Sequence, residues 1–383
     1  MKLVGEASSA DARAAAEYPE ELKKIIEDGN YSSKQVFNID ETGLYWKKLP
    51  NRTYISKEEA SAPGFKASKD RLTLLLGANA EGDYKLKPAL VYHSENPRAL
   101  KVRVVKLTLF YVTIFYAKDC AKEFFRPYKI LRFFFFCQGY DKAFLPVYWY
   151  ANSKGWMTGA VFGDYFKNKL HRELEVYCNK ENIPFKILLI VDNAPSHPAY
   201  LADISNNIKI VFLPPNTTSL IQPCDQGIIS TFKAYYLRST LANLVKVTEQ
   251  QNISVRDYWR QFTVKDALTF IKDSWSEVPT SCCNGVWKKL CPQFVHDFKG
   301  YSIDDNVAKA NVKSLRLAQQ VGFEDLEEED IDNLLQSHTQ ELSNEDLFDI
   351  EKERVKMMEE KEEAAAAAAS PQPQRAPVMP DHR

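Results

Sequence analysis

The chain of 383 residues is 45% hydrophobic and 12% aromatic with a formal net charge of −1, a composition typical of globular proteins. Its apolar runs are shorter than the roughly 20 residues of a membrane span, and it shows no N-terminal signal pattern, which argues against a membrane protein and a secreted one. Seven cysteines without paired spacing indicate a reducing compartment.

Charge is distributed unevenly along the chain. Residues 324–363 contain 17 acidic and 4 basic side chains, so residues 1–323 carry a charge of about +11. A basic body is compatible with nucleic-acid binding, and the acidic helices are candidate contacts for protein partners.

The N-terminal residues predict a helix followed by strands. A helical pattern within residues 1–30 is interrupted at Tyr18 and Pro19. Val36–Ile39 then predicts a strand that ends at Asp40, and Gly43 is predicted to turn the chain into a second strand.

A hairpin and an unusual segment come next. The turn at 80–83 lies between two apolar runs, 71–78 and 86–93, and predicts a hairpin. The segment 102–138 is rich in phenylalanine and lacks glycine. Its apolar runs are too short for a membrane span and would be prone to aggregate if exposed.

The second half alternates between helices and strands. Residues 156–179 have helical periodicity, and the apolar run Ile187–Val191 predicts a central strand covered on both faces. A strand over 208–213 precedes a long amphipathic helix, on which Lys233 is predicted to face solvent. Further helices are expected at 257–275, at 281–298 and in the acidic region.

Cysteines near the C-terminal helices raise the question of a zinc site. Cys282, Cys283, Cys291 and His296 match none of the usual zinc-binding spacings. Buried thiols on a helix are therefore the preferred interpretation.

Three acids occupy comparable positions at the ends of predicted elements. Asp192 directly follows the central strand, at the edge where open α/β sheets bind ligands, although an Asp-Asn turn would explain it equally well. Asp40 ends an earlier strand, and Asp225 lies in the first turn of the long helix, where the helix dipole alone would favour an acid by about 0.3–1 kcal/mol. Converging carboxylates would bind hard divalent cations, and two such ions about 3.5–4 Å apart support phosphodiester cleavage.

Four stretches resemble a known family: FNIDETGLYWKKLP, KASKDRLTLLLGANAEGDYKLKPALVYHSENPRALK, KILLIVDNAPSHP and FLPPNTTSLIQPCDQGIISTFKAYYLR. Together they are similar to the Tigger family of pogo-type DDE transposases, with the jerky proteins and centromere protein B as relatives. The resemblance extends from about Gly5 to Met358, apart from one gap. It implies an α/β fold, a ribonuclease H-like mixed sheet flanked by helices and followed by a helical C-terminal region.

The same resemblance assigns an acid triad to Asp40, Asp192 and Asp225, as catalytic residues and as ligands of two Mg²⁺ or Mn²⁺ ions. It implies metal-dependent DNA cleavage and joining, or a DNA-binding role derived from it, with DNA as partner and a nuclear location. The implied organisation is a helical lead-in (1–34), a DDE core (35–248), a helical extension (249–322), an acidic helical region (323–363) and a disordered tail (364–383).

Basic, amide and hydroxyl side chains near these motifs are candidate DNA contacts: Lys66, Lys69, Arg71, Asn193, His197, Thr218, Gln222 and Lys233. Several have plainer explanations. Lysines are usually solvated, Asn193 and His197 suit turn chemistry, and Thr217 or Thr218 could cap the long helix.

The chain departs from the family pattern in two respects. It begins immediately before the core, without a preceding basic recognition helix, so we expect little sequence-specific end binding. The segment 102–138 interrupts a stretch that is continuous in the family, within the span that must bring Asp40 to Asp192. Two hypotheses remain: a DDE endonuclease core that retains cleavage, or an inactive, domesticated nucleic-acid-binding or protein-interaction protein. Oligomeric state is left open.

Overall fold

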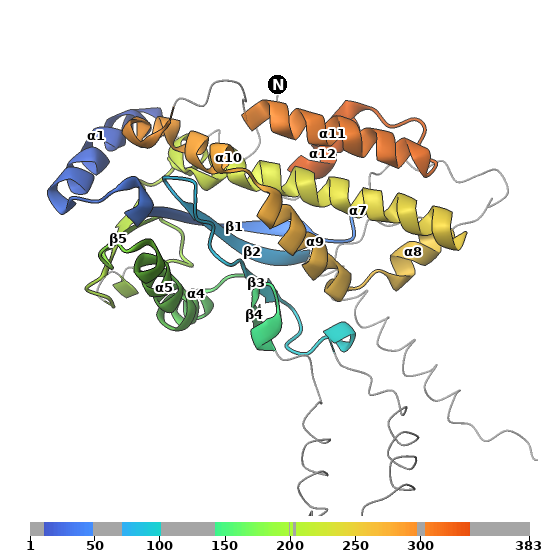
Figure 1. Cartoon of the computed structure of the whole chain (residues 1–383), viewed down its shortest axis with the longest axis horizontal. Coiled ribbons are helices and arrows are strands. Elements are labelled where there is room, and N and C mark those ends of the chain that lie inside the picture. Colours follow the sequence, from blue (N-terminus) through green and yellow to red (C-terminus); the bar gives the residue numbers. More distant parts are fainter. Residues whose placement is uncertain are drawn as a thin grey trace, which may run out of the picture. The chain divides into compact units, whose positions relative to one another are not determined.

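A six-stranded mixed sheet in the order β4-β3-β2-β1-β5-β6 organises the fold (Figure 1). The computed structural model describes residues 11–48, 71–100, 142–198, 200–201, 204–296 and 303–337. The strands are β1 (Val36–Tyr45), β2 (Arg71–Asn79), β3 (Ala89–Tyr92), β4 (Tyr148–Ala151), β5 (Ile187–Val191) and β6 (Ile208–Phe212).

Strand directions divide the sheet into two halves. β1, β2 and β3 form an antiparallel meander, and β5 and β6 continue from β1 in parallel. β4 pairs in parallel with β3 at the outer edge. A meander followed by two parallel strands is the arrangement of a ribonuclease H-like sheet, so the predicted fold class is confirmed.

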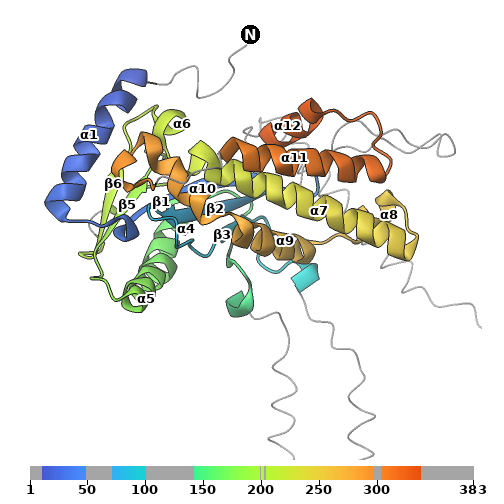
Figure 2. The same ribbon diagram turned by 45° about the horizontal axis from the view of Figure 1, so that its top comes forward.

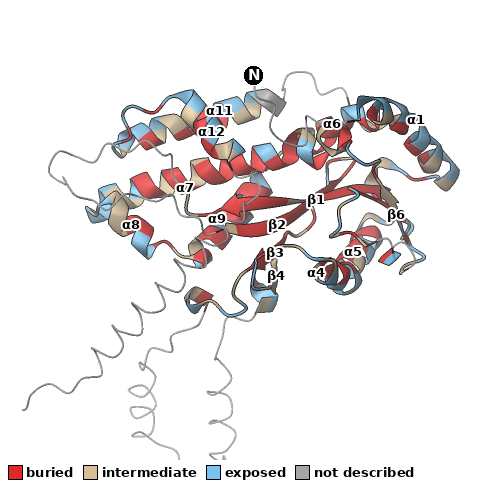
Figure 3. Cartoon of the chain, turned by 180° about the vertical axis from the view of Figure 1, so that it is seen from behind, coloured by how far each residue is buried: buried red, intermediate tan, exposed pale blue. Residues whose placement is uncertain are grey.

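Helices cover both faces of the sheet (Figures 1 and 2). One face packs against α7, with α1, α9, α10, α11 and α12 in the same core, and the other packs against α4 and α5. The strands β1, β2, β3 and β5 between these layers are almost entirely buried, whereas the edge strands β4 and β6 are only partly buried (Figure 3). The helices are α1 (Ala12–Gly29), α4 (Gly159–Tyr165), α5 (His171–Glu181), α6 (Thr218–Ile221), α7 (Ile229–Gln251), α8 (Val255–Gln261), α9 (Val264–Glu277), α10 (Thr280–Gly285), α11 (Ile303–Gln320) and α12 (Glu328–Gln336).

Several predicted elements are confirmed. The 80–83 turn joins β2 to the following residues with Gly82 at a positive φ of 82°, and the Asn79 side chain accepts the Gly82 and Tyr84 N–H groups at 3.0 and 3.1 Å. The apolar run Ile187–Val191 is a fully buried strand between β1 and β6. None of the described helices is long and apolar enough to cross a membrane.

Two local predictions are wrong. β1 does not end at Asp40 or turn at Gly43, because it pairs continuously with β2 from Phe37 to Tyr45. Gly43 instead leaves space for a neighbouring side chain, since a Cβ there would collide with the Arg71 guanidinium. Helix α1 likewise runs through Pro19, and its end is capped by Asn30 in the left-handed region.

The C-terminal part of the described chain packs on the main core. α11 and α12 place Ala318, Ile331 and Leu334 in the same hydrophobic cluster as α7, and the acidic side chains in the first turn of α12 remain outside this cluster. The segment 102–138, the tail 364–383 and most of the acidic region lie outside the described residues, and the domain boundaries remain predictions.

Candidate active site

The three predicted acids lie on neighbouring elements. Asp40 lies in the middle of β1, Asp192 directly follows β5, and Asp225 lies in a π-helical turn, η7 (Cys224–Ile228), that leads into α7. β1 and β5 are adjacent parallel strands, paired from Val36 to Asn38. Their carboxyl ends therefore lie at the same edge of the sheet.

Asp40 is the most perturbed of these acids. Its side chain is buried, and burial raises its pKa well above the ordinary value. The negative charge of Asp225 and a hydrogen bond with that carboxyl group raise the pKa further, and Glu41 and Asp192 add to the repulsion. Four carboxyl groups thus share one small region.

A buried amide connects the elements that carry the acids. The Asn38 side chain donates to the Ile190 carbonyl on β5 at 3.0 Å and accepts from the Cys224 backbone N–H at 2.9 Å. Asn38 is 1% exposed. This side chain therefore fixes β1 to β5 and to the turn that contains Asp225.

Irregular backbone positions Asp225. The η7 turn is π-helical, and Gly227 within it leaves the helical region at φ 160°. A π-helical turn offsets the residues before it relative to the following regular helix, and such turns are frequent at functional sites. Asp225 lies in this turn and shares a hydrogen bond with Asp40.

A histidine joins Asp192 to a fourth acid, Glu41. His197 Nδ1 lies 2.6 Å from Asp192 Oδ1 and 3.2 Å from the Asp192 carbonyl oxygen, while Nε2 lies 3.0 Å from Glu41 Oε1. Burial alone would lower the pKa of His197, but hydrogen bonds to Asp192 and Glu41 and their charges raise it to about 10. The two carboxylates thus favour the protonated imidazole.

Lys233 does not face solvent as predicted, because it is 3% exposed. Its ammonium group has no hydrogen-bond partner among the described residues. Burial lowers the pKa of Lys233 to about 7; the charges of Asp225 and Asp40 oppose this shift, whereas Arg71 adds to it. Its helical neighbours four residues away, Ile229 and Leu237, are also buried, and this spacing is the sequence signal for its orientation.

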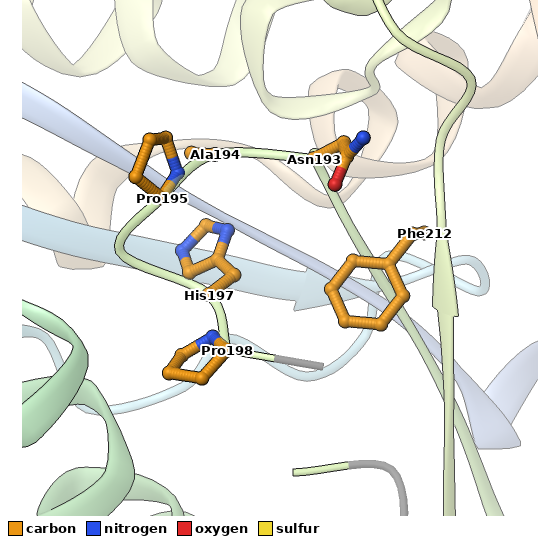
Figure 4. A pocket seen from close by; sticks show the side chains of 6 residues that line it. All are labelled: Asn193, Ala194, Pro195, His197, Pro198 and Phe212. Atoms are coloured by element: carbon orange, nitrogen blue, oxygen red, sulfur yellow. The ribbon is translucent and has the colours of Figure 1, made fainter. Parts of the chain in front are cut away.

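A hollow of about 400 Å³ lies beside Asp192, at the carboxyl ends of β5 and β6 (Figure 4). Asn193 and Phe212 face each other across it, with His197 and Pro198 along one side. Open α/β sheets bind ligands at this position. The predicted contact residue Asn193 is exposed here, whereas His197 has no exposed side-chain surface.

The remaining candidate DNA contacts have different surroundings. Arg71 lies over Gly43 on β1, and the Gln222 side chain is fully buried, with neither amide atom hydrogen-bonded within the described residues. Thr218 begins α6, and the Thr217 hydroxyl donates to the Pro214 carbonyl at 2.7 Å instead of capping a helix. Lys66 and Lys69 lie outside the described residues.

The donor set fits a hard divalent cation. Carboxylate oxygens are the ligands preferred by Mg²⁺ and Mn²⁺, and mutual repulsion between close carboxyl groups is relieved by a bound cation. Asp40, Asp192 and Asp225 provide such oxygens, and one ligand atom each from Glu41, Asp192 and His197 lie within 4.8 Å of one another. Sequence reasoning missed Glu41, although it directly follows Asp40.

The cysteines form no comparable group among the described residues. Cys282, Cys283 and Cys291 are buried free thiols, and burial raises the pKa of each. His296 Nε2 lies 3.0 Å from Glu81 Oε1. These contacts favour the interpretation of buried structural thiols.

Comparison with known proteins gives related matches. A family model described as DDE superfamily endonuclease matches residues 69–287, which include Asp192 and Asp225 and begin after Asp40. The chain is 27% identical over 289 residues to the human (Homo sapiens) Jerky protein homolog, covering 75% of this chain and 42% of that protein. It is 26% identical over 306 residues to human Tigger transposable element-derived protein 7, covering 75% of this chain and 48% of that protein.

More distant matches follow. CENP-B homolog protein 2 of Schizosaccharomyces pombe (strain 972 / ATCC 24843) is 26% identical over 249 residues, covering 62% of this chain and 38% of that protein. The chain thus spans less than half the length of these relatives. The solved Mos1 mariner paired end complex with Mn matches with a TM-score of 0.37 and 10% identity, over 78% of this chain and 63% of that one, a likeness too weak to support any argument.

Proposed function

Because the chain belongs to the DDE superfamily endonuclease family, we propose that it binds DNA and cleaves phosphodiester bonds with two Mg²⁺ ions held by Asp40, Asp192 and Asp225. When bound, two such ions activate a water molecule and stabilise the leaving 3′ oxygen. The family match identifies the kind of domain, and we propose that this chain itself cleaves DNA.

One observation carries the proposal. Asp40 is buried and repelled by three other carboxyl groups, and it shares a hydrogen bond with Asp225. Buried like charges are unfavourable, so this arrangement is stable only where Asp40 is protonated or a cation compensates the charge, and a bound divalent cation would supply that compensation. Sites with such strongly perturbed groups are frequently functional.

The residues of the chain would have distinct tasks. Asp192, at the edge of the sheet and partly exposed, would face the DNA together with the exposed Asp225. Asp40 would lie beneath them as the buried ligand. The adjacent hollow, with the aromatic ring of Phe212 and the amide of Asn193, has the surface chemistry to accommodate a DNA strand next to the acids.

A second candidate function is DNA binding without cleavage. It is favoured by the cations already present at the acids: His197 contacts Asp192, and Lys233 lies within the electrostatic reach of Asp40 and Asp225. Such charges would let the acid cluster persist without metal. Nuclear location and contacts of the acidic region with proteins belong to either candidate.

Nicking of supercoiled plasmid DNA distinguishes the two candidates. The wild-type chain should nick in Mg²⁺ or Mn²⁺ and not in EDTA, and Asp192→Asn should nick more than about 100-fold more slowly. This lower bound follows because even the outer-shell partners of metal ligands typically contribute about 10–100-fold. DNA binding, measured in EDTA, should be equal or stronger in the variant, since a negative charge near phosphates is removed.

The control is Asp273→Asn, which removes an exposed carboxylate on α9 and should leave nicking unchanged. Equal nicking by the wild type and Asp192→Asn would remove the catalytic claim. DNA binding without metal-dependent nicking by the wild type would establish the second candidate.

A further inference from the structure

The contacts of His197 suggest a role in orienting another residue. Its imidazole has no exposed surface, and it lies between Asp192 on one side and Glu41 on the other. The ring packs against Phe162 of α4 with a centroid separation of 4.3 Å. His197 thus borders the hollow, but its imidazole exposes no surface to a strand lying there.

The loop that carries His197 is tightly closed. The His197 backbone N–H donates to the Ala194 carbonyl at 2.9 Å, and its Nδ1 lies within hydrogen-bond distance of the Asp192 carbonyl oxygen, at 3.2 Å, and within ion-pair distance of Asp192 Oδ1, at 2.6 Å. Pro195 and Pro198 restrict the backbone on either side. The Asp192 side chain is thus held by a residue five positions later in the same short loop.

Glu41 completes this arrangement from a strand. Its carboxylate accepts from His197 Nε2 at 3.0 Å, so the ring cannot rotate without losing one of two charge-assisted contacts. Glu41 lies next to Asp40 on β1 but points to the opposite face, because successive strand residues alternate. The imidazole therefore links the strand of one acid to the loop of another.

We propose that His197, supported by Glu41, is a positioning residue that holds the Asp192 carboxylate in the orientation needed to bind a divalent cation. This proposal rests on the proposed function. It assigns neither His197 nor Glu41 as a metal ligand. In metal sites, residues that hydrogen-bond to a metal-ligating side chain commonly fix its orientation. Such residues typically contribute about 10–100-fold to metal affinity or activity.

Two substitutions separate the contacts of the histidine. Asparagine places its amide nitrogen near the position of Nδ1, so His197→Asn retains the contact with Asp192. Glutamine places its amide nitrogen near Nε2, so His197→Gln retains only the contact with Glu41. If His197 positions the Asp192 carboxylate, Mn²⁺ affinity should stay near wild type in His197→Asn. It should fall roughly 10–100-fold in His197→Gln and His197→Ala.

The measurement is Mn²⁺ titration of the DNA-free chain, combined with steady-state nicking and thermal melting of each variant. His197→Ala should lower kcat and leave the KM for DNA unchanged, because the imidazole has no exposed surface with which to contact DNA. Glu41→Gln keeps an oxygen that can accept the hydrogen bond but loses the negative charge, so it should weaken Mn²⁺ binding less than Glu41→Ala does.

Results that contradict the positioning role of His197 differ from results that contradict the proposed function. Wild-type Mn²⁺ affinity and kcat in folded His197→Ala would overturn the proposal while nicking itself continued. Equal losses in His197→Asn and His197→Ala, or a loss in Glu41→Gln as large as that in Glu41→Ala, would indicate direct metal ligation and also overturn it. If His197→Ala does not fold, the comparison of His197→Asn with His197→Gln decides. A wild-type chain that neither binds Mn²⁺ nor nicks DNA would instead contradict the proposed function.

Discussion

At the scale of single residues, Lys233 is the clearest departure from ordinary protein chemistry. A buried ammonium without a hydrogen-bond partner is unfavourable, and burial lowers the pKa of Lys233 from 10.5 to about 7. A folded-state pKa below the unfolded one means that the charged form opposes folding. The resulting loss of stability is absent above pH 10.5 and increases as the pH falls toward 7.

Replacement of this lysine by an apolar residue of similar length should therefore stabilise the metal-free protein. We expect Lys233→Met to raise the free energy of unfolding by about 2–4 kcal/mol at pH 7, with a smaller gain at pH 9.5. Urea unfolding in EDTA at both pH values measures the difference. Lys246→Met, at an exposed position on the same helix, is the control and should change stability little. A less stable Lys233→Met chain would show that attraction to Asp225 and Asp40 outweighs the burial of the ammonium.

At the scale of elements, the acids depend on how β1, β5 and η7 are joined. The Asn38 side chain bonds to both β5 and η7, in addition to the backbone pairing of β1 with β5. Loss of this amide would leave the Cys224 N–H and the Ile190 carbonyl without these partners. Unsatisfied buried groups destabilise by about 1–3 kcal/mol.

Asn38→Ala should thus lower the free energy of unfolding by roughly 1–3 kcal/mol and should reduce nicking even where the protein remains folded. The reason is that Asp192 and Asp225 lose their common attachment to the strand of Asp40. Asn79→Ala is the matched control, because Asn79 is also a buried, hydrogen-bonded asparagine but lies at the hairpin. Nicking assays below the melting temperature of both variants test the difference. Equal losses of activity in the two variants would show that Asn38 acts through stability alone.

Elements set by local pattern were predictable from the sequence, and those set by distant contacts were not. Ile187–Val191 is a continuous apolar run, and this pattern alone indicated a buried strand with Asp192 at its end. Asp40 was misplaced at a strand end because glycine usually signals a turn, whereas pairing with β2 carries β1 through Gly43. The contact between Glu41 and His197 joins residues 156 positions apart, and no periodicity encodes it.

At the scale of the whole molecule, the central question is whether the unusual segment 102–138 separates Asp40 from Asp192. The segment lies outside the described residues, but it connects β3 to β4 at the edge of the sheet opposite β6. The acids lie on β1, β5 and η7, on the other side of β2. Lys142, just after the segment, forms an ion pair with Glu95, just before it. The chain therefore leaves and re-enters the described fold at neighbouring positions.

Deletion of Val102–Gln138 should accordingly preserve both the fold and the acid site. Shortening a connection between two elements changes the closure free energy by about 1 kcal/mol or less, which corresponds to a change in Tm within about 4 °C. Metal-dependent nicking should be unchanged, because no acid-bearing element is joined through this edge. Far-UV circular dichroism, thermal melting and plasmid nicking test both expectations. Gel filtration reports whether removal of this phenylalanine-rich segment reduces aggregation. A deleted chain that failed to fold would show that the segment completes the edge of the sheet, since β4 would then depend on residues of the segment to pair with β3.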